Sequence, residues 1–294
     1  MFGFINIYKP EGMTSFDVVA VLRKVTHIKQ IGHTGTLDPF ATGVLPICIG
    51  RSTKLIEYLP DDKEYIATIQ FGANTDTYDK EGQIIDTFDK KVSESEFISA
   101  LKNFEGEIEQ FPPIYSAIKV KGKKLYEYAR SGKEVEIKPR RVTIYKIELI
   151  NFIEKSQQAK IKIACSKGTY IRSIAYDLGK ILNCGGYLTN LERTKAGMFD
   201  LSNAVKLDNI KDVEDVELNL INPLQVLPQN KYVLSDSEKE RVCHGMWIKP
   251  QNLSDSLSNN ISNNVVFFIY DDKMYGVGII EEDKIRVKKV FEVL

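Results

Sequence analysis

The stretch from position 32 to position 50, GHTGTLDPFATGVLPICIG, constrains the fold more than any other segment of the chain. Its four glycines let the backbone turn sharply or pass close to a bulky partner, and Pro39 removes a backbone donor and stiffens the chain directly after Asp38. The apolar run over 44–49 predicts a buried strand. We therefore expect a loop that delivers Asp38 shortly before a core strand. On local chemistry alone, an aspartate before proline is more often a turn residue or a helix cap than a functional group.

Length and composition bound the class of protein. The chain has 294 residues, 43% of them hydrophobic, enough for one large domain and a small one. No apolar run approaches the roughly 20 residues of a membrane-spanning helix, and the first residues are too few and too polar for a signal peptide. We therefore expect a cytoplasmic protein without a membrane partner. The cysteines are scattered, with no CxxC pair and no histidine at ligand spacing, so we expect no metal and reduced, mostly buried thiols at Cys48, Cys165, Cys184 and Cys243.

The formal net charge of zero hides an uneven distribution of charge. Residues 111–146 contain ten basic and three acidic side chains, a local charge of +7, whereas 61–110 contain thirteen acids and five lysines. Tyr115, Tyr126 and Tyr128 within the basic strip offer stacking surfaces for bases. Clustered cations neutralise phosphates, so the pattern favours an RNA partner over the alternative of an ordinary solvated face.

Periodicity predicts a mixture of helices and strands without internal repeats. Strands are expected over 2–8, 44–49, 64–71, 141–152 and 160–165. Helices are expected from a cap at Ser15 to His27 and over 51–59, 94–104, 125–131 and 170–182. Because the elements do not alternate strictly, we predict an α+β fold around an extended sheet.

The carboxyl-terminal third has a different character. Residues 200–229 are polar and acidic and are interpreted as a connector. Short strand-like runs over 265–270, 274–280 and 285–291, separated by polar turns, then predict a small β-rich domain. The expected domains are 1–228 and 229–294.

Several motifs carry a resemblance to a known family. The stretch over 32–50 resembles, nearly letter for letter, the signature GHTGTLDPxATGxLPxCxG of the bacterial tRNA pseudouridine synthase B family. The match continues, in order, through NIYKPEGMTS at 6–15, KEYIATIQFGANTDTYDKEG at 63–82, YSAIKVKGKKLYEYARSG at 115–132 and CSKGTYIRSIAYDLG at 165–179. The resemblance implies a pseudouridine-synthase fold, with a mixed, largely antiparallel sheet flanked by helices and loops. It also implies a small carboxyl-terminal RNA-binding domain of the PUA type.

The resemblance further implies an isomerase that converts uridine to pseudouridine in the T-loop of tRNA, at position 55. The family acts as a monomer, without cofactor, metal or guide RNA. Asp38 matches the family's catalytic aspartate, which either attacks the substrate or stabilises an oxocarbenium ion; both options stay open. Arg172 matches the arginine whose guanidinium can orient that carboxylate bidentately. Tyr65 matches the tyrosine that lies against the target base, where it can move a proton.

Substrate contacts follow from the same resemblance. The target uridine must be flipped out of the folded loop, and His33 matches the histidine that contacts the disrupted T-loop. Tyr170 and Leu191 match residues that close the uracil pocket. A basic insertion over about 111–141 closes over the T-arm in the family, and we expect it to be mobile without RNA. The residues expected to hold phosphates are Lys9, Lys54, Lys119, Lys121, Lys123, Lys124, Arg130 and Arg141.

Three other functions compete with this interpretation. A tRNA-binding chaperone would need the basic strip but none of Asp38, Tyr65 and Arg172, so their joint presence favours catalysis. The catalytic subunit of guide-dependent particles shares the aspartate motif, but KGKKLYEYAR is typical of the stand-alone bacterial type. A P-loop nucleotide enzyme is excluded because no GK[ST] follows the glycines.

Overall fold

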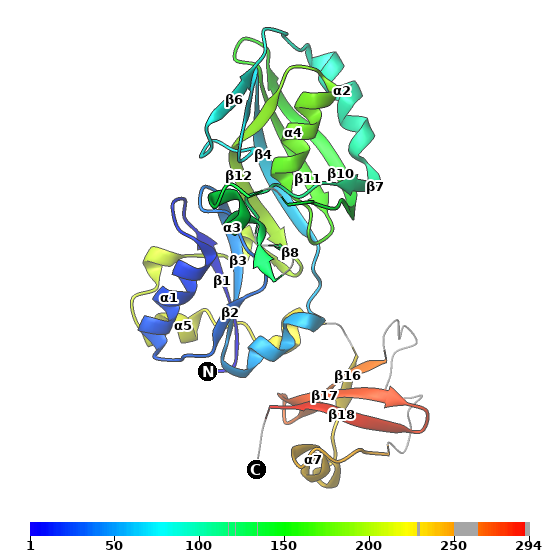
Figure 1. Cartoon of the computed structure of the whole chain (residues 1–294). Coiled ribbons are helices and arrows are strands. Elements are labelled where there is room, and N and C mark those ends of the chain that lie inside the picture. The colour runs from blue at the N-terminus through cyan, green and yellow to red at the C-terminus, as the bar shows by residue number, and fades with distance from the viewer. Residues whose placement is uncertain (117, 121, 134, 228–229, 250–263, 292–294) are drawn as a thin grey trace. The chain divides into compact units, whose positions relative to one another are not determined.

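The computed structural model describes residues 1–116, 118–120, 122–133, 135–227, 230–249 and 264–291 (Figure 1). The chain divides into two compact units. The larger unit contains Ile5–Cys48 and Pro60–Leu220, and the smaller contains Met1–Phe4, Ile49–Leu59 and Ile221–Leu294. Each unit is built on its own sheet.

The larger sheet is mixed. Its strands are β1 (Gly3–Lys9), β2 (Ile31–His33), β3 (Thr42–Ile49), β4 (Lys63–Phe71), β7 (Gly106–Gln110), β10 (Arg140–Ile153), β11 (Gln158–Cys165), β12 (Gly186–Ala196), β13 (Phe199–Asp200) and β14 (Val205–Lys206). Among the described residues these ten strands follow the order β14-β1-β3-β12-β4-β11-β10-β7, with β13 beside β12 and β2 beside β3. The β12–β3 and β1–β14 pairs are parallel, and the pairs from β12 through β4, β11 and β10 to β7 are antiparallel. The predicted α+β class with a largely antiparallel sheet is confirmed.

Alternating burial explains why the central strands form this sheet. Along β4, Tyr65, Ala67, Ile69 and Phe71 are buried while the residues between them are partly exposed. Ala159, Ile161, Ile163 and Cys165 of β11 alternate in the same way. Side chains in a strand point to opposite faces in turn, so one face of each strand enters the core.

Helices cover the sheet where apolar stripes require it. The helix α4 (Ile171–Ile181) packs against β12 and β4, and α2 (Glu94–Leu101) packs against β10 (Figure 1). The predicted helix over 94–104 ends as α at Leu101 and continues as a 3-10 turn, Lys102–Phe104. The helix α1 (Ser15–Thr26) is capped by Thr14 and not by Ser15 as predicted, because the Thr14 side chain accepts the Asp17 N–H in a capping box.

The sequence patterns missed several strands and misjudged one segment. The central strand β12 was not predicted, because its polar letters, YLTNLERT, hide a buried face of Leu188, Leu191 and Arg193. The strand β7 was also missed. The predicted connector over 200–229 in fact adds β14 to the sheet and forms two short helices, α5 (Val213–Leu218) and α6 (Pro223–Val226).

The loops of the larger unit contain short strands, one short helix and 3-10 turns. A hairpin of β5 (Ala73–Thr75) and β6 (Ile84–Thr87) holds the TDTYDKEG turn. Within the basic insertion, β8 (Lys119–Val120) pairs with β9 (Lys123–Lys124), and α3 (Leu125–Arg130) follows. Further 3-10 turns are Leu201–Asn203 and Leu207–Asn209.

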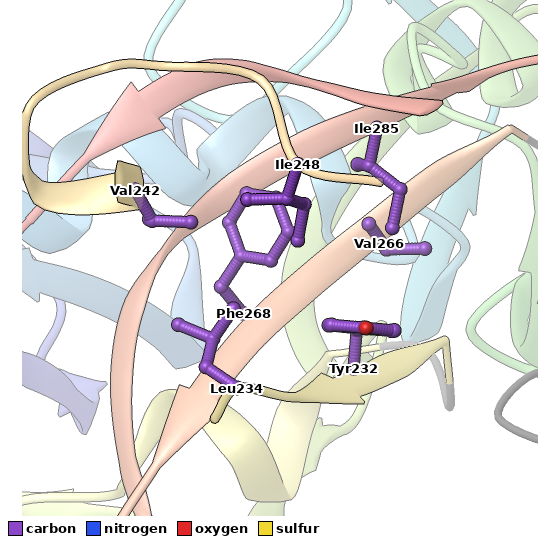
Figure 2. Close-up of a cluster of buried hydrophobic side chains, with 7 residues drawn as sticks. All are labelled: Tyr232, Leu234, Val242, Ile248, Val266, Phe268 and Ile285. Carbon is purple, nitrogen blue, oxygen red and sulfur yellow. The ribbon is translucent and has the colours of Figure 1, made fainter. Parts of the chain in front are cut away.

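The smaller unit is β-rich, as predicted for the carboxyl-terminal end. Its strands are β15 (Lys231–Val233), β16 (Val265–Tyr270), β17 (Lys273–Glu281) and β18 (Lys284–Val290), with α7 (Asp236–Cys243) beside them. Figure 2 shows its buried cluster, in which Phe268 lies among Val242, Ile248 and Leu234. The segment predicted as a helix over 51–59 is a 3-10 helix, Gly50–Tyr58, and the ring of Tyr58 packs edge-on against Phe267.

Three general expectations can be compared with the described residues. Among them, no helix is long and apolar enough to span a membrane. All four cysteines are buried, and Cys48, Cys165 and Cys184 are free thiols. Within the same residues, no group of three or more His, Cys, Asp or Glu side chains is arranged to hold a metal ion.

Candidate active site

Asp38 lies in the loop between β2 and β3, as the glycine and proline pattern predicts. Its neighbour Leu37 is buried. The Leu37 N–H donates to the Ser15 hydroxyl over 2.8 Å, and that hydroxyl donates to the Leu37 carbonyl over 3.2 Å. The Asp38 side chain is 31% exposed. The loop is thus anchored to the start of α1, while the carboxylate can still be reached from outside.

Arg172, the second residue of α4, contacts Asp38. Its Nη2 donates a hydrogen bond to Oδ1 over 3.1 Å, and its Nε lies 2.9 Å from Oδ2. The Nε–H does not point at that oxygen and makes no hydrogen bond, so the contact is an ion pair with one hydrogen bond, not the two-bond fork expected from the sequence. The Arg172 side chain is only 5% exposed, and burial in a fixed position suits a group that orients a carboxylate.

Asp79 holds the other side of the same guanidinium, a role that sequence reasoning missed. Arg172 Nη1 donates to Asp79 Oδ2 and to the Thr77 carbonyl, each over 3.1 Å, and Nη2 donates to the Tyr115 carbonyl over 3.0 Å. Asp79 is in turn held by the Thr77 hydroxyl at 2.6 Å and the Glu81 N–H at 3.0 Å. The available signal was the TDTYDKEG motif, whose second aspartate is Asp79.

The arrangement sets the ionisation of Asp38. Burial raises the pKa of the Asp38 carboxyl, Arg172 opposes this rise, and Asp79 adds to it. The net direction is upward from the ordinary aspartate range. One guanidinium is therefore shared by two carboxylates, and Asp38 is the more accessible of the two.

Tyr65 and Leu191 come from neighbouring strands. Tyr65 on β4 is paired with Arg193 on β12, and Leu191 is paired with Ala67, so these four side chains share one face of the sheet. Burial raises the pKa of the Tyr65 phenol, and the positive charge of Arg193 opposes that rise. The Asp38 charge also acts on Tyr65, so the tyrosine stands within electrostatic reach of the loop.

Tyr170 precedes α4 and is fixed through its backbone. Its N–H donates to Gln110 Oε1 over 2.7 Å, and Gln110 Nε2 donates to its carbonyl over 3.0 Å. Burial raises the pKa of the Tyr170 hydroxyl, and the charges of Asp38 and Arg172 both act on it. The structure therefore brings Asp38, Arg172, Tyr65 and Tyr170 into one neighbourhood.

Lys9 does not lie where a phosphate-binding lysine was expected. Its side chain is fully buried and its Nζ donates to the carbonyls of Pro10, Met13 and Pro39, over 2.8, 2.6 and 3.1 Å. An ammonium has three protons, and all three are used. Burial lowers the pKa of Lys9 to about 8. Lys9 thus ties the residues after β1 to the residue that follows Asp38.

His33 and Lys54 differ in their surroundings. His33 ends β2 and is partly buried, its Nδ1 has no hydrogen-bond partner, and burial together with Arg193 lowers its pKa. It is therefore a neutral imidazole at neutral pH.

Lys54 is exposed in the 3-10 helix Gly50–Tyr58, which belongs to the smaller unit, whereas Asp38 belongs to the larger one.

The basic insertion places most of its described cations at the surface. Lys119 and Lys123 are exposed, and the Lys124 ammonium lies 5.4 Å from the centre of the Tyr126 ring. Arg141 is 74% exposed and lies 3.5 Å from Glu107. Lys121 lies outside the described residues, and Arg130 is described only as the last residue of α3. The Tyr115 carbonyl connects the beginning of this insertion to Arg172.

Comparison with known proteins identifies the family of this chain. Residues 23–171 match the TruB family pseudouridylate synthase (N terminal domain). This chain belongs to that family. Residues 172–227 also match the tRNA pseudouridylate synthase B C-terminal domain. As a TruB-family member the chain is an enzyme, a pseudouridine synthase, and the resemblance found in its motifs is confirmed.

Full-length relatives agree with the family assignment. The chain is 41% identical over 293 residues to "tRNA pseudouridine synthase B" of Clostridium tetani, covering 99% of both chains. It is 42% identical to the protein of the same name from Caldanaerobacter subterraneus subsp. tengcongensis, covering 98% of this chain and 99% of that one. Among solved structures, it is similar to a chain of the archaeal box H/ACA sRNP Nop10-Cbf5 complex, with a TM-score of 0.71 and 25% identity over 99% of this chain and 86% of that one.

Proposed function

We propose that this TruB-family enzyme converts uridine to pseudouridine at position 55 in the T-loop of tRNA, without a guide RNA. The observation that carries the proposal is the ion pair between Asp38 of the GHTGTLDP loop and Arg172 of α4, with Tyr65 within electrostatic reach of Asp38. Relatives named tRNA pseudouridine synthase B, about two-fifths identical over nearly their whole length, support tRNA as the substrate.

The reaction breaks the bond between N1 of uracil and C1′ of ribose and forms a bond between C5 and C1′. C5 loses a proton and N1 gains one, so the base is rearranged without oxidation or reduction. In the proposal, the Asp38 carboxylate acts at C1′, either by attacking it or by stabilising an oxocarbenium ion. The retained uracil turns over against Tyr65, whose neutral hydroxyl can relay the proton that leaves C5 to N1.

Arg172 serves this chemistry by keeping Asp38 ionised and correctly aimed. Burial alone would favour a protonated Asp38, and the guanidinium opposes that tendency. The other hydrogen bonds of its two terminal nitrogens go to Asp79 and two carbonyls, so the guanidinium cannot easily turn away from Asp38. Holding Asp38 in place in this way speeds the reaction, because a misplaced reacting group raises the activation free energy.

RNA binding falls to other residues in the proposal. The exposed cations of the insertion, with Lys54, contact phosphates, and the neutral ring of His33 contacts the loop from which uridine is flipped. Tyr170 and Leu191 contact the flipped base. The proposal does not include Lys9 among the phosphate contacts, because its three ammonium protons already donate to carbonyls. The proposal includes a PUA-type RNA-binding role for the carboxyl-terminal β-rich part, and a monomeric, cytoplasmic enzyme without metal or cofactor.

The experiment incubates the purified protein alone with an unmodified tRNA transcript and maps pseudouridine by chemical sequencing. We expect modification at position 55 only, and none when that uridine is replaced by cytidine. Asp38→Asn should bind tRNA normally and form no pseudouridine, because the substitution keeps the side-chain volume and removes the charge. Modification that requires an added guide RNA, or normal turnover by Asp38→Asn, would contradict the proposal.

A further inference from the structure

We propose that Arg193 is a positioning residue, which holds the Asp38 loop in its working place by binding carbonyl oxygens on both sides of Asp38. The inference rests on the proposed role of Asp38. Arg193 lies on β12, a strand that sequence patterns did not predict, and outside the stretches that carry the family resemblance.

The contacts of Arg193 enclose the loop. Its Nε donates to the Val44 carbonyl over 2.7 Å, its Nη2 to the Gly35 carbonyl over 3.1 Å and its Nη1 to the Thr36 carbonyl over 3.4 Å. Gly35 and Thr36 precede Asp38, whereas Val44 follows it in β3. One planar guanidinium therefore ties the two ends of the loop together, which a single ammonium donor could not do with the same geometry.

The burial of Arg193 argues against an incidental role. Its side chain is among the largest fully buried ones, with 1% of the residue exposed. Within the described part of the chain, no carboxylate forms an ion pair with it. A buried charge without a counter-ion is costly, and an apolar side chain of similar length would suit the core better if packing were the only demand. The carbonyl dipoles of the Asp38 loop compensate this charge, together with the Tyr65 hydroxyl, with which Arg193 also interacts.

Gly43 shows how closely the loop and β12 are joined. It is paired with Arg193 in the parallel β3–β12 ladder and has φ +102°. A Cβ at this position would lie 2.3 Å from the Arg193 carbonyl oxygen, so only glycine permits the approach. This contact brings β3 against β12, where Val44 can accept its hydrogen bond from Arg193.

The pKa of His33 reports the position of the Arg193 charge, and its measurement does not depend on turnover. That charge acts together with burial to lower the pKa of His33, at the start of the same loop. Arg193→Met removes both the positive charge and the planar set of N–H donors. Arg193→Lys keeps the charge and loses the planar donors. Thr194→Val is a matched control, because Thr194 is the next residue of β12, is buried, and bonds Glu64 instead of the loop.

The experiment measures three properties of these variants: single-turnover rate at saturating enzyme on a T-arm RNA, RNA affinity, and the titration of His33 by NMR. We expect the rate to fall at least about a hundredfold in Arg193→Met and about tenfold in Arg193→Lys, with affinity changed less than about threefold. The pKa of His33 should rise in Arg193→Met only. Thr194→Val should keep the parental rate.

A parental rate in Arg193→Met, an equal loss of rate in Thr194→Val, or an unmoved His33 in Arg193→Met would each overturn the inference. If the proposed function itself is wrong, the experiment gives a different result. In that case the parental protein itself would leave the T-arm uridine unmodified, while the His33 titration would still report on the placement of Arg193.

Discussion

Arg172 Nη2 donates a hydrogen bond to Asp38 Oδ1 over 3.1 Å, joining residues that stand 134 positions apart in the chain. The same guanidinium holds Asp79 through Nη1. The geometry of Asp38 is therefore decided by a helix, a hairpin turn and a glycine-rich loop together, and each contact leads to a measurable expectation.

Replacing Arg172 by Lys should separate orientation from binding. A lysine supplies a positive charge but not the planar fork that reaches both carboxylates at once. We expect turnover to fall by at least about a hundredfold, while tRNA affinity changes by less than about tenfold. Single-turnover rates and equilibrium binding distinguish the outcomes. A variant that binds poorly but reacts at the parental rate once saturated would place Arg172 among the phosphate contacts.

Asp79→Asn should move the acidic side of the pH–rate profile. The pKa of Asp38 is raised mainly by burial and partly by Asp79, so the parental enzyme should lose activity as pH falls at values above the ordinary aspartate range. Removing the Asp79 charge lowers the pKa of Asp38, and the acidic limb should shift to lower pH. The maximal rate should also fall, because Arg172 loses a partner. An acidic limb that moves upward would contradict this assignment of charges.

Replacing Lys119 and Lys123 by Ala should weaken tRNA binding and flatten its dependence on salt. Each lost phosphate contact should reduce the slope of log affinity against log salt by roughly 0.7 to 0.9. Lys91→Ala is the matched control, because Lys91 is exposed but lies outside the basic insertion. If the double variant and the control show the same slope, the described part of the insertion does not contact RNA.

Lys9→Met should affect the fold and the rate without changing the salt dependence. The buried ammonium bonds three carbonyls, and one of them belongs to Pro39, directly after Asp38. We expect a lower melting temperature and slower single turnover, since the loop loses an anchor and three carbonyls lose a donor. A reduced salt slope with unchanged thermal stability would instead restore Lys9 as a phosphate ligand.

Much of the fold could be predicted because it follows from local patterns. Alternating burial in β4 and β11, and the polar turns between β16, β17 and β18, are visible in the letters themselves. The strand β12 could not be found in this way. Its inward face includes Arg193, and a charged residue inside a strand breaks the apolar alternation on which such predictions depend.

By itself the sequence determined the loop that carries Asp38, the helix that carries Arg172 and the family to which both belong, because motif letters and short-range periodicity record these directly. Only the tertiary structure decided that Asp79 shares the guanidinium, that Lys9 faces carbonyls instead of phosphates, and that Arg193 encloses the loop. The physical reason is that the partners of a buried cation are chosen by segments brought together in folding. Whether a lysine or arginine meets a phosphate, a carboxylate or a carbonyl depends on contacts that its sequence neighbours do not specify.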